Sequence, residues 1–167
     1  MSVVSEFLAA NERYAGTFSK GHLPMPPGRK VAVVTCMDAR LDPARALGLE
    51  EGDAHVIRNA GGRASGDALR SLIISEQLLG TREIVVIHHT DCGMLTFSND
   101  QLREQLARGF NADAREIDFL PFSDVAQSTR DDIATIRNSP FIPVDIPISG
   151  FVYDVQTGTL TPIDDDQ

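Results

Sequence analysis

The sequence is short of cysteine, of basic charge and of long apolar runs, and each shortage excludes a class of protein. Its 167 residues include 2 cysteines, which excludes a disulfide-rich scaffold. They include 15 Lys and Arg against 24 Asp and Glu, and the net charge of −9 disfavours nucleic acids and anionic membranes as partners. No apolar run approaches the roughly 20 residues that a membrane span requires. With Glu6 and no basic cluster at the N-terminus, a secretory signal is not expected, and we expect a cytoplasmic protein.

The composition is that of a folded globular protein, with 42% hydrophobic and 23% charged residues. The length fits one domain, and we expect residues 1–167 to form it. Residues 2–17 have helical spacing of apolar side chains, and residues 21–29 form an arm rich in proline. Such a helix is difficult to place in the core, so we expect residues 1–29 to pack on a partner subunit.

Three short apolar runs, at residues 31–35, 54–58 and 84–87, are typical of strands buried on both faces. A helical pattern over residues 66–80 lies between the second and third runs, and this order predicts a βαβ unit. The expected fold class is therefore α/β, with a central, mostly parallel sheet flanked by helices. Further predicted elements are helices over 97–108 and 123–138, the second capped by Ser123, an irregular extended segment over 142–148, and a hairpin over 151–155 and 159–163.

Residue types that bind metals follow two of the predicted strands at their carboxyl ends. Cys36 follows the first strand, and His89 and Cys92 follow the third as an H-x-x-C pair. Parallel strands end at one edge of their sheet, so we expect these side chains to meet there. Thiolate and imidazole ligands suit zinc, and three protein ligands leave the open fourth position of a catalytic site. His88 is expected to point to the other face of the sheet.

Asp38 and Arg40 stand two and four residues after Cys36. Arg40 can hold the Asp38 carboxylate bidentately and keep it ionised, so that Asp38 accepts a hydrogen bond from water at the metal. If released, Asp38 could become a fourth ligand in a closed state. The segment Arg58-Asn59-Ala60-Gly61-Gly62 follows the second strand, and its glycines would let backbone N–H groups approach an anion.

Three other interpretations compete with a catalytic zinc site. Cys36 and Cys92 could be two small buried hydrophobic residues. They could belong to a non-enzymatic interaction module stabilised by zinc, with Asp38 as a permanent fourth ligand. They could also form a redox-responsive disulfide. His22, His55 and His88 are each a structural residue or a proton shuttle, and the sequence does not choose between these roles.

Taken together, the segments C-x-D-x-R at residues 36–40, R-N-A-G at residues 58–61 and H-x-x-C-G at residues 89–93 resemble the β-carbonic anhydrase family, in its compact bacterial and fungal branch. The resemblance implies reversible hydration of carbon dioxide to bicarbonate and a proton through a zinc-bound hydroxide, which is a lyase activity. It implies one zinc per chain on Cys36, His89 and Cys92, with Asp38 and Arg40 as a catalytic pair. Substrate contacts are expected at Gly61, Gly62 and Gly93.

The resemblance also implies a homo-oligomer, either a dimer or a dimer of dimers with the active sites at the subunit interface. Members with an inhibitory bicarbonate pocket have a tryptophan three residues before the first ligand. This sequence has no tryptophan and places Val33 there. Some compact relatives hydrolyse carbonyl sulfide with the same metal motifs, so carbonyl sulfide hydrolysis is an alternative activity.

Overall fold

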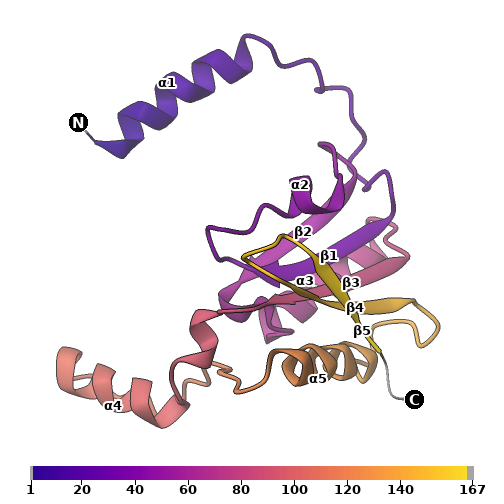
Figure 1. Ribbon diagram of the computed structural model, residues 1–167. Helices are drawn as coiled ribbons and strands as arrows, with labels where there is room; N and C mark the ends of the chain where they lie inside the picture. Colours follow the sequence, from indigo (N-terminus) through magenta and orange to yellow (C-terminus); the bar gives the residue numbers. More distant parts are fainter. Residues whose placement is uncertain (1, 165–167) are drawn as a thin grey trace.

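A five-stranded sheet forms the centre of the fold in the computed structural model, which describes residues 2–164. The strand order is β2-β1-β3-β4-β5, and only β5 runs antiparallel to its neighbour (Figure 1). The strands are β1 (Val31–Cys36), β2 (Ala54–Asn59), β3 (Glu83–His89), β4 (Ile148–Tyr153) and β5 (Leu160–Ile163). The predicted α/β class with a mostly parallel sheet is confirmed, although β4 begins at Ile148, within the segment expected to be irregular.

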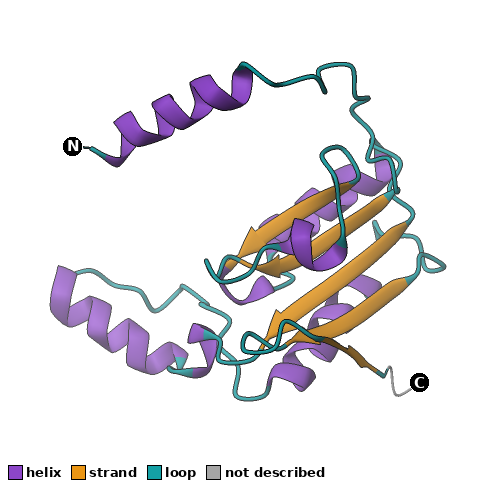
Figure 2. Cartoon of the chain, turned by 45° about the horizontal axis from the view of Figure 1, so that its top comes forward, coloured by secondary structure: helices purple, strands orange, loops and turns teal. Residues whose placement is uncertain are grey.

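The two faces of the sheet are covered unequally (Figure 2). One face packs on α3 (Gly66–Gln77) and α5 (Val125–Arg137), where Val34 and Val86 meet Leu72 and Ile133 in the main hydrophobic core. The opposite face carries the short helix α2 (Pro43–Leu47), which lies over Thr35 and Ile87. Side chains alternate along a strand, so the same strands supply both faces.

Local capping explains where the helices begin. The Ser65 side chain accepts from the Ala68 N–H and starts α3. The predicted cap Ser123 was wrong: α5 starts one residue later, because Asp124 accepts from the Gln127 N–H. Asp caps as well as Ser, and here the backbone turns into the helix only after Asp124. The helix α4 (Asn99–Phe110) starts with a capping box at Ser98.

The helix α2 was not predicted from the sequence. Asp42 caps it, Pro43 occupies its first turn, and Gly48 ends it in the left-handed conformation at φ 61°. These are ordinary start and stop signals. Only five residues separate them, too few for a helical pattern of apolar side chains to show.

The helix α1 (Val3–Ala15) projects away from the sheet at the end of an extended arm (Figure 1). No residue of α1 is buried. The arm is nevertheless held to the turn before β2: the Tyr14 hydroxyl donates to Glu51 over 2.5 Å, and Lys20 pairs with Glu50 at 3.1 Å. The Gly28 N–H also donates to the Gly52 carbonyl over 2.8 Å. These contacts attach α1 and the arm to the turn before β2.

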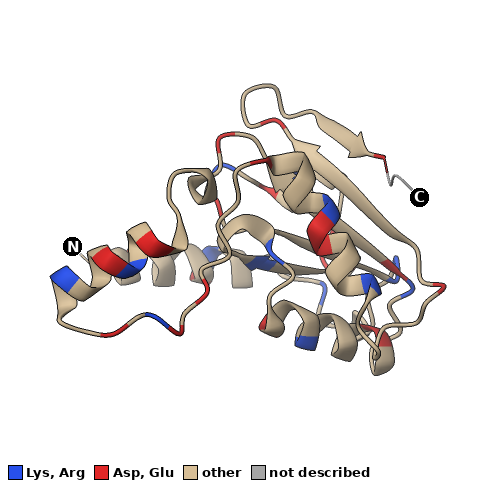
Figure 3. Ribbon diagram, turned by 90° about the horizontal axis from the view of Figure 1, so that it is seen from below, with Lys and Arg blue, Asp and Glu red and all other residues tan. Residues whose placement is uncertain are grey.

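Acidic and basic residues alternate along the ribbon in Figure 3, and the basic residues are spread over several elements. Within residues 2–164, the helices lack the combination of length and apolar character that crossing a membrane requires.

Candidate metal centre

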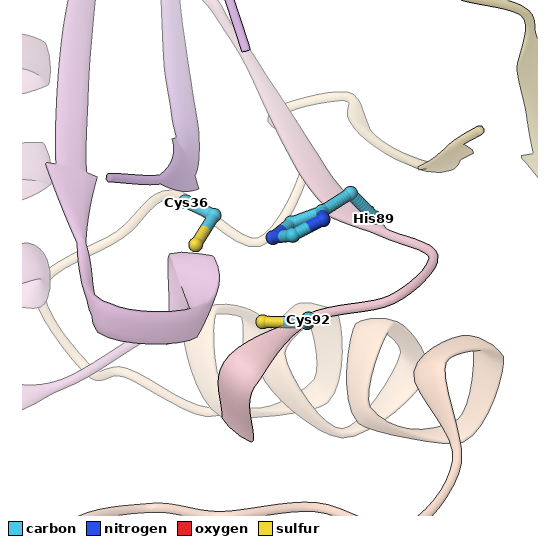
Figure 4. A group of neighbouring side chains, drawn as sticks. All are labelled: Cys36, His89 and Cys92. Atoms are coloured by element: carbon cyan, nitrogen blue, oxygen red, sulfur yellow. The ribbon is translucent and has the colours of Figure 1, made fainter. Parts of the chain in front are cut away.

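The three predicted ligands meet at the carboxyl edge of the sheet. Cys36 is the last residue of β1, His89 is the last residue of β3, and Cys92 follows three residues later in the turn before a short 3-10 helix, η2 (Gly93–Leu95). The two strands are parallel neighbours, so their ends coincide. All three side chains are buried, and their ligand atoms lie within 4.8 Å of one another. Figure 4 shows the side chains of Cys36, His89 and Cys92 directed toward a common space.

The hydrogen bonding of His89 tests whether a metal fits this space. Its Nδ1 atom donates to the Thr90 carbonyl over 2.8 Å, so Nε2 is the unprotonated nitrogen. In the described part of the chain, His89 Nε2 is the one buried side-chain nitrogen or oxygen without a hydrogen-bond partner. A buried polar atom without a partner is costly. A cation between His89 Nε2 and the two sulfurs would satisfy it, and one nitrogen with two thiolates is a donor set that zinc prefers.

Cys36 and Cys92 are close enough for each to change the pKa of the other. Hydrogen bonding from Cys92, and then from His89 and the backbone N–H groups of Asp38 and Gly61, outweighs burial and holds the pKa of Cys36 well below its ordinary value. The same contact with Cys36 raises the pKa of Cys92. The pair therefore shares one proton. A bound cation in place of that proton stabilises both residues as thiolates.

Asp38 and Arg40 form the predicted pair beside the ligands. Both Asp38 oxygens accept from the Arg40 guanidinium, at 3.0 and 2.8 Å, and Oδ1 also accepts from the Arg40 N–H at 2.9 Å. These bonds hold the pKa of Asp38 well below its usual range. Asp38 Oδ2 lies 3.8 Å from His89 Nε2, which is too far for a hydrogen bond and places the carboxylate at the mouth of the metal space.

Asp91 gives Arg40 a second anchor that the sequence reasoning missed. Arg40 donates to the Asp91 carboxylate over 2.7 Å and to the Asp91 carbonyl over 2.9 Å. Asp91 lies between His89 and Cys92 and has a left-handed backbone at φ 54°. Arg40 thus ties the segment after β1 to the segment after β3.

The end of β2 and the turn that follows it contact the backbone of Cys36. Arg58 donates to the carbonyls of Cys36 and Asp38 over 3.0 and 2.7 Å. Gly61 and Gly62 are buried with φ of 83° and 72°, and a Cβ on Gly62 would lie 2.9 Å from the Cys36 nitrogen. Their lack of a side chain therefore serves close packing. Contact of Gly61, Gly62 and Gly93 with a substrate stays a prediction.

His88 points to the opposite face of the sheet, as predicted, and belongs to a buried polar cluster there. Its Nδ1 lies 2.7 Å from Ser128 Oγ, and its Nε2 lies 3.0 Å from Asp132 Oδ2. Arg63 donates to Asp132 over 2.8 Å. Burial raises the pKa of Asp132, but hydrogen bonds from His88 and Arg63 outweigh it and hold the pKa below its ordinary value. The sequence reasoning missed Arg63 and Asp132, because 69 residues separate them and no motif joins them.

Apolar side chains surround the two cysteines. Leu41 and Met94 are buried against them, and Phe122 and Tyr153 pack on the same cluster. The two cysteines therefore contact apolar side chains, while Asp38 stands on their polar side.

Comparison with known proteins gives the family. The family profile described as carbonic anhydrase matches residues 31–160. Beta-carbonic anhydrase 1 of Mycobacterium tuberculosis is 46% identical over 98% of this chain and 99% of its own length. The crystal structure of carbonic anhydrase from Streptococcus mutans has a TM-score of 0.94 at 55% identity, over 98% of this chain and 99% of that one. Carbon disulfide hydrolase of Saccharolobus solfataricus is 36% identical over 94% of this chain and 87% of its own length.

These likenesses extend over the sheet, the flanking helices and the edge that carries the metal ligands. They confirm the resemblance drawn from the three sequence segments, and with it the prediction of an enzyme. The chain belongs to the β-carbonic anhydrase family.

Proposed function

We propose that this chain binds one zinc ion through Cys36, His89 and Cys92 and catalyses the reversible hydration of carbon dioxide to bicarbonate and a proton. The observation that carries the proposal is the unpartnered His89 Nε2 atom, buried beside two cysteine sulfurs. Zinc with three protein ligands retains a position for water and makes that water nucleophilic near neutral pH.

Asp38 acts on the attacking water as a fixed acceptor. Arg40 keeps the carboxylate ionised, so Asp38 only accepts hydrogen bonds and directs the water's remaining lone pair away from itself. A free Asp38 could instead become the fourth ligand and close the site. The bonds from Arg40 to Asp38 and to Asp91 oppose that movement, because both would have to rearrange.

The surrounding residues suit a small, apolar substrate and a charged product. Leu41, Met94 and Phe122 exclude water around the two cysteines, which strengthens electrostatic effects inside the site. We assign Gly61, Gly62 and Gly93 to backbone contacts with substrate or product. The reason is clearest at Gly93, where a Cβ would meet no atom within 4 Å and a ligand can approach the backbone.

The test is an assay of purified protein with its zinc content measured, at pH 8.5. Rapid hydration of carbon dioxide by the zinc-loaded protein, lost on removal of zinc, is the expected result. Carbonyl sulfide and carbon disulfide are assayed beside it, because one group of relatives is named carbon disulfide hydrolase. Rapid sulfide release with slow hydration would retain the metal site but replace the substrate. Zinc-loaded protein without any of these activities would refute the proposal.

We further propose that the chain is a homo-oligomer in which α1 packs on a second copy. Val3, Val4, Phe7 and Leu8 lie along one side of α1 and are each more than half exposed, at 54, 57, 66 and 63%. A 13-residue helix is marginal in water unless it buries such a side. Burial of these side chains in a second copy would supply the missing contact.

The test of assembly is the molar mass in solution. The double substitution Phe7→Glu and Leu8→Glu is expected to lower the mass from that of a dimer or tetramer to that of a smaller species. Arg13→Gln, on the side of the same helix away from Phe7 and Leu8, serves as the matched control and should leave the mass unchanged. A wild-type protein that is monomeric at micromolar concentration would refute the proposal.

A further inference from the structure

Three buried charged or ionisable side chains lie behind the metal centre and have no part in the chemistry described so far. The side chains of Arg63, His88 and Asp132 are 12, 0 and 4% exposed. Buried charges are expensive, and well-packed apolar residues often replace them without loss of stability. Stability alone is thus a weak explanation for this cluster.

Hydrogen bonds join the three side chains to one another and to α5. Asp132 Oδ2 accepts from Arg63 Nε at 2.8 Å and lies 3.0 Å from His88 Nε2. His88 Nε2 also lies 3.2 Å from the Gly62 carbonyl, so it faces two acceptors and carries a proton. His88 Nδ1 contacts Ser128 Oγ at 2.7 Å, and Ser128 also donates to the Val125 carbonyl. The imidazole ring is therefore fixed from both sides by α5.

The cluster reaches the segment of each metal ligand. His88 directly precedes His89 in β3, and Gly62 lies against the backbone of Cys36. Phe122 stacks on His88 with ring centroids 5.4 Å apart, and the Arg63 guanidinium lies 5.5 Å from the centroid of the Phe122 ring. Phe122 packs on the cluster that contains Cys92, and its N–H donates to the Met94 carbonyl.

We propose that Asp132 is a positioning residue for the metal centre: by holding Arg63 and His88, it fixes the relative positions of the segments that carry Cys36, His89 and Cys92. The inference rests on the proposed zinc site but concerns how firmly the zinc is held. An asparagine at position 132 would present an amide donor to Arg63 or His88, both of which donate, and the cluster would separate. Residues that orient metal ligands typically contribute about 10- to 100-fold to metal affinity or activity.

The experiment measures the release of zinc from the purified, zinc-loaded protein to a chelator. Asp132→Asn is expected to release zinc at least about tenfold faster than wild type and to lower kcat with little change in KM. Asp131→Asn is the matched control: Asp131 is exposed on the same helix, accepts from Gln127 at 2.9 Å, and its loss should leave zinc release unchanged. Ser128→Ala removes the contact to His88 Nδ1 together with the hydrogen bond from Ser128 to the Val125 carbonyl, and leaves the Arg63–Asp132 pair in place. It gives a milder second variant and should release zinc several-fold faster.

Wild-type zinc release in Asp132→Asn, even with a lowered melting temperature, would overturn the inference and leave the cluster a purely structural one. If Asp132→Asn does not fold, a wild-type rate of zinc release in Ser128→Ala would overturn the inference. Because the readout is zinc release, it is separate from the proposed reaction. A wild-type protein that holds zinc but hydrates no carbon dioxide would refute the proposed function and leave this inference standing.

Discussion

The tripeptide Asp-Ala-Arg occurs twice in this chain, at Asp38–Arg40 and at Asp113–Arg115, and the two copies fold almost identically. In both, the arginine N–H and Nε donate to Oδ1 of the aspartate, at 2.9 and 3.0 Å in the first copy and at 3.0 Å for both bonds in the second. In both, Nη2 donates to Oδ2, at 2.8 and 2.6 Å. The local geometry is therefore a property of the tripeptide itself.

Their surroundings differ completely. The Asp38 side chain is 18% exposed beside Cys36 and His89, and Asp91 anchors its arginine. The Asp113 side chain is 58% exposed, and its arginine is 84% exposed. An exposed ion pair of this kind contributes little to stability. The same three residues thus form a surface contact at one place, and at the other a half-buried pair beside the candidate metal ligands, where the proposed mechanism gives Asp38 a chemical role.

The largest expected effect comes from replacing a cysteine, because only the first Asp-Ala-Arg copy has cysteines beside it. Cys36→Ser and Cys92→Ser should each lose zinc, because a serine hydroxyl is a poor zinc ligand beside the thiolate it replaces. Hydration of carbon dioxide should fall to background with the loss of metal. Metal analysis and stopped-flow assays measure both quantities. Full activity in a zinc-free variant would contradict the prediction.

The second prediction replaces the aspartate carboxylate by an amide in each of the two copies. Asp38→Asn should retain zinc but lower kcat by about 100-fold or more, which is the order of magnitude lost when one positioned hydrogen-bonding group is removed from an active site. Asp113→Asn should leave kcat unchanged, since its carboxylate faces solvent. Parallel assays at equal zinc content make the comparison. Equal turnover of Asp38→Asn and wild type would show that Asp38, like Asp113, has no part in turnover.

The third prediction concerns the support behind the first copy. Gly62→Ala should destabilise the protein by about 2 kcal/mol or more, because φ is 72° and the new Cβ would lie 2.9 Å from the Cys36 nitrogen. Gly66→Ala, at the start of α3 with no atom within 4 Å, should change stability by less than about 0.5 kcal/mol. Urea unfolding of both variants tests this pair. Similar free energies of unfolding for the two variants would show that the turn after β2 can accommodate a Cβ at position 62.

The smallest expected effect is the pH dependence of the second copy. The Arg115 guanidinium lowers the pKa of Asp113 to about 2, against about 3.9 in an unfolded chain. A lowered carboxyl pKa stabilises the folded protein above the unfolded value, and that contribution is lost as pH falls toward 2. The difference in unfolding midpoint between wild type and Asp113→Asn should therefore be small at pH 6 and shrink below pH 4. A difference that increases on acidification would contradict this assignment.

The sequence alone predicted the parts of the molecule that depend on local pattern. The apolar runs ending at Thr35 and Ile87 indicated adjacent buried strands, and sheet geometry then required Cys36 and His89 to meet. The Asp38–Arg40 pair followed from spacing, because two residues are enough for its own hydrogen bonds to form.

The parts that the sequence did not predict depend on tertiary packing. Asp132 meets Arg63 only because α5 docks on the sheet beside the turn after β2, and nothing in either segment indicates the partner. Asp91 is anchored by Arg40, 51 residues away, for the same reason. The start of α5 at Asp124 was missed because Ser123 is an equally good cap by residue type.

The attachment of the N-terminal arm has a consequence for the thermodynamics of assembly. Tyr14 and Lys20 contact Glu50 and Glu51 within a single chain, so these contacts form without a second copy. In the homo-oligomer proposed above, association would therefore order fewer residues than it would with an unattached helix, and the entropic cost of binding would be lower. The apolar side of α1 would then act as a preorganised binding surface.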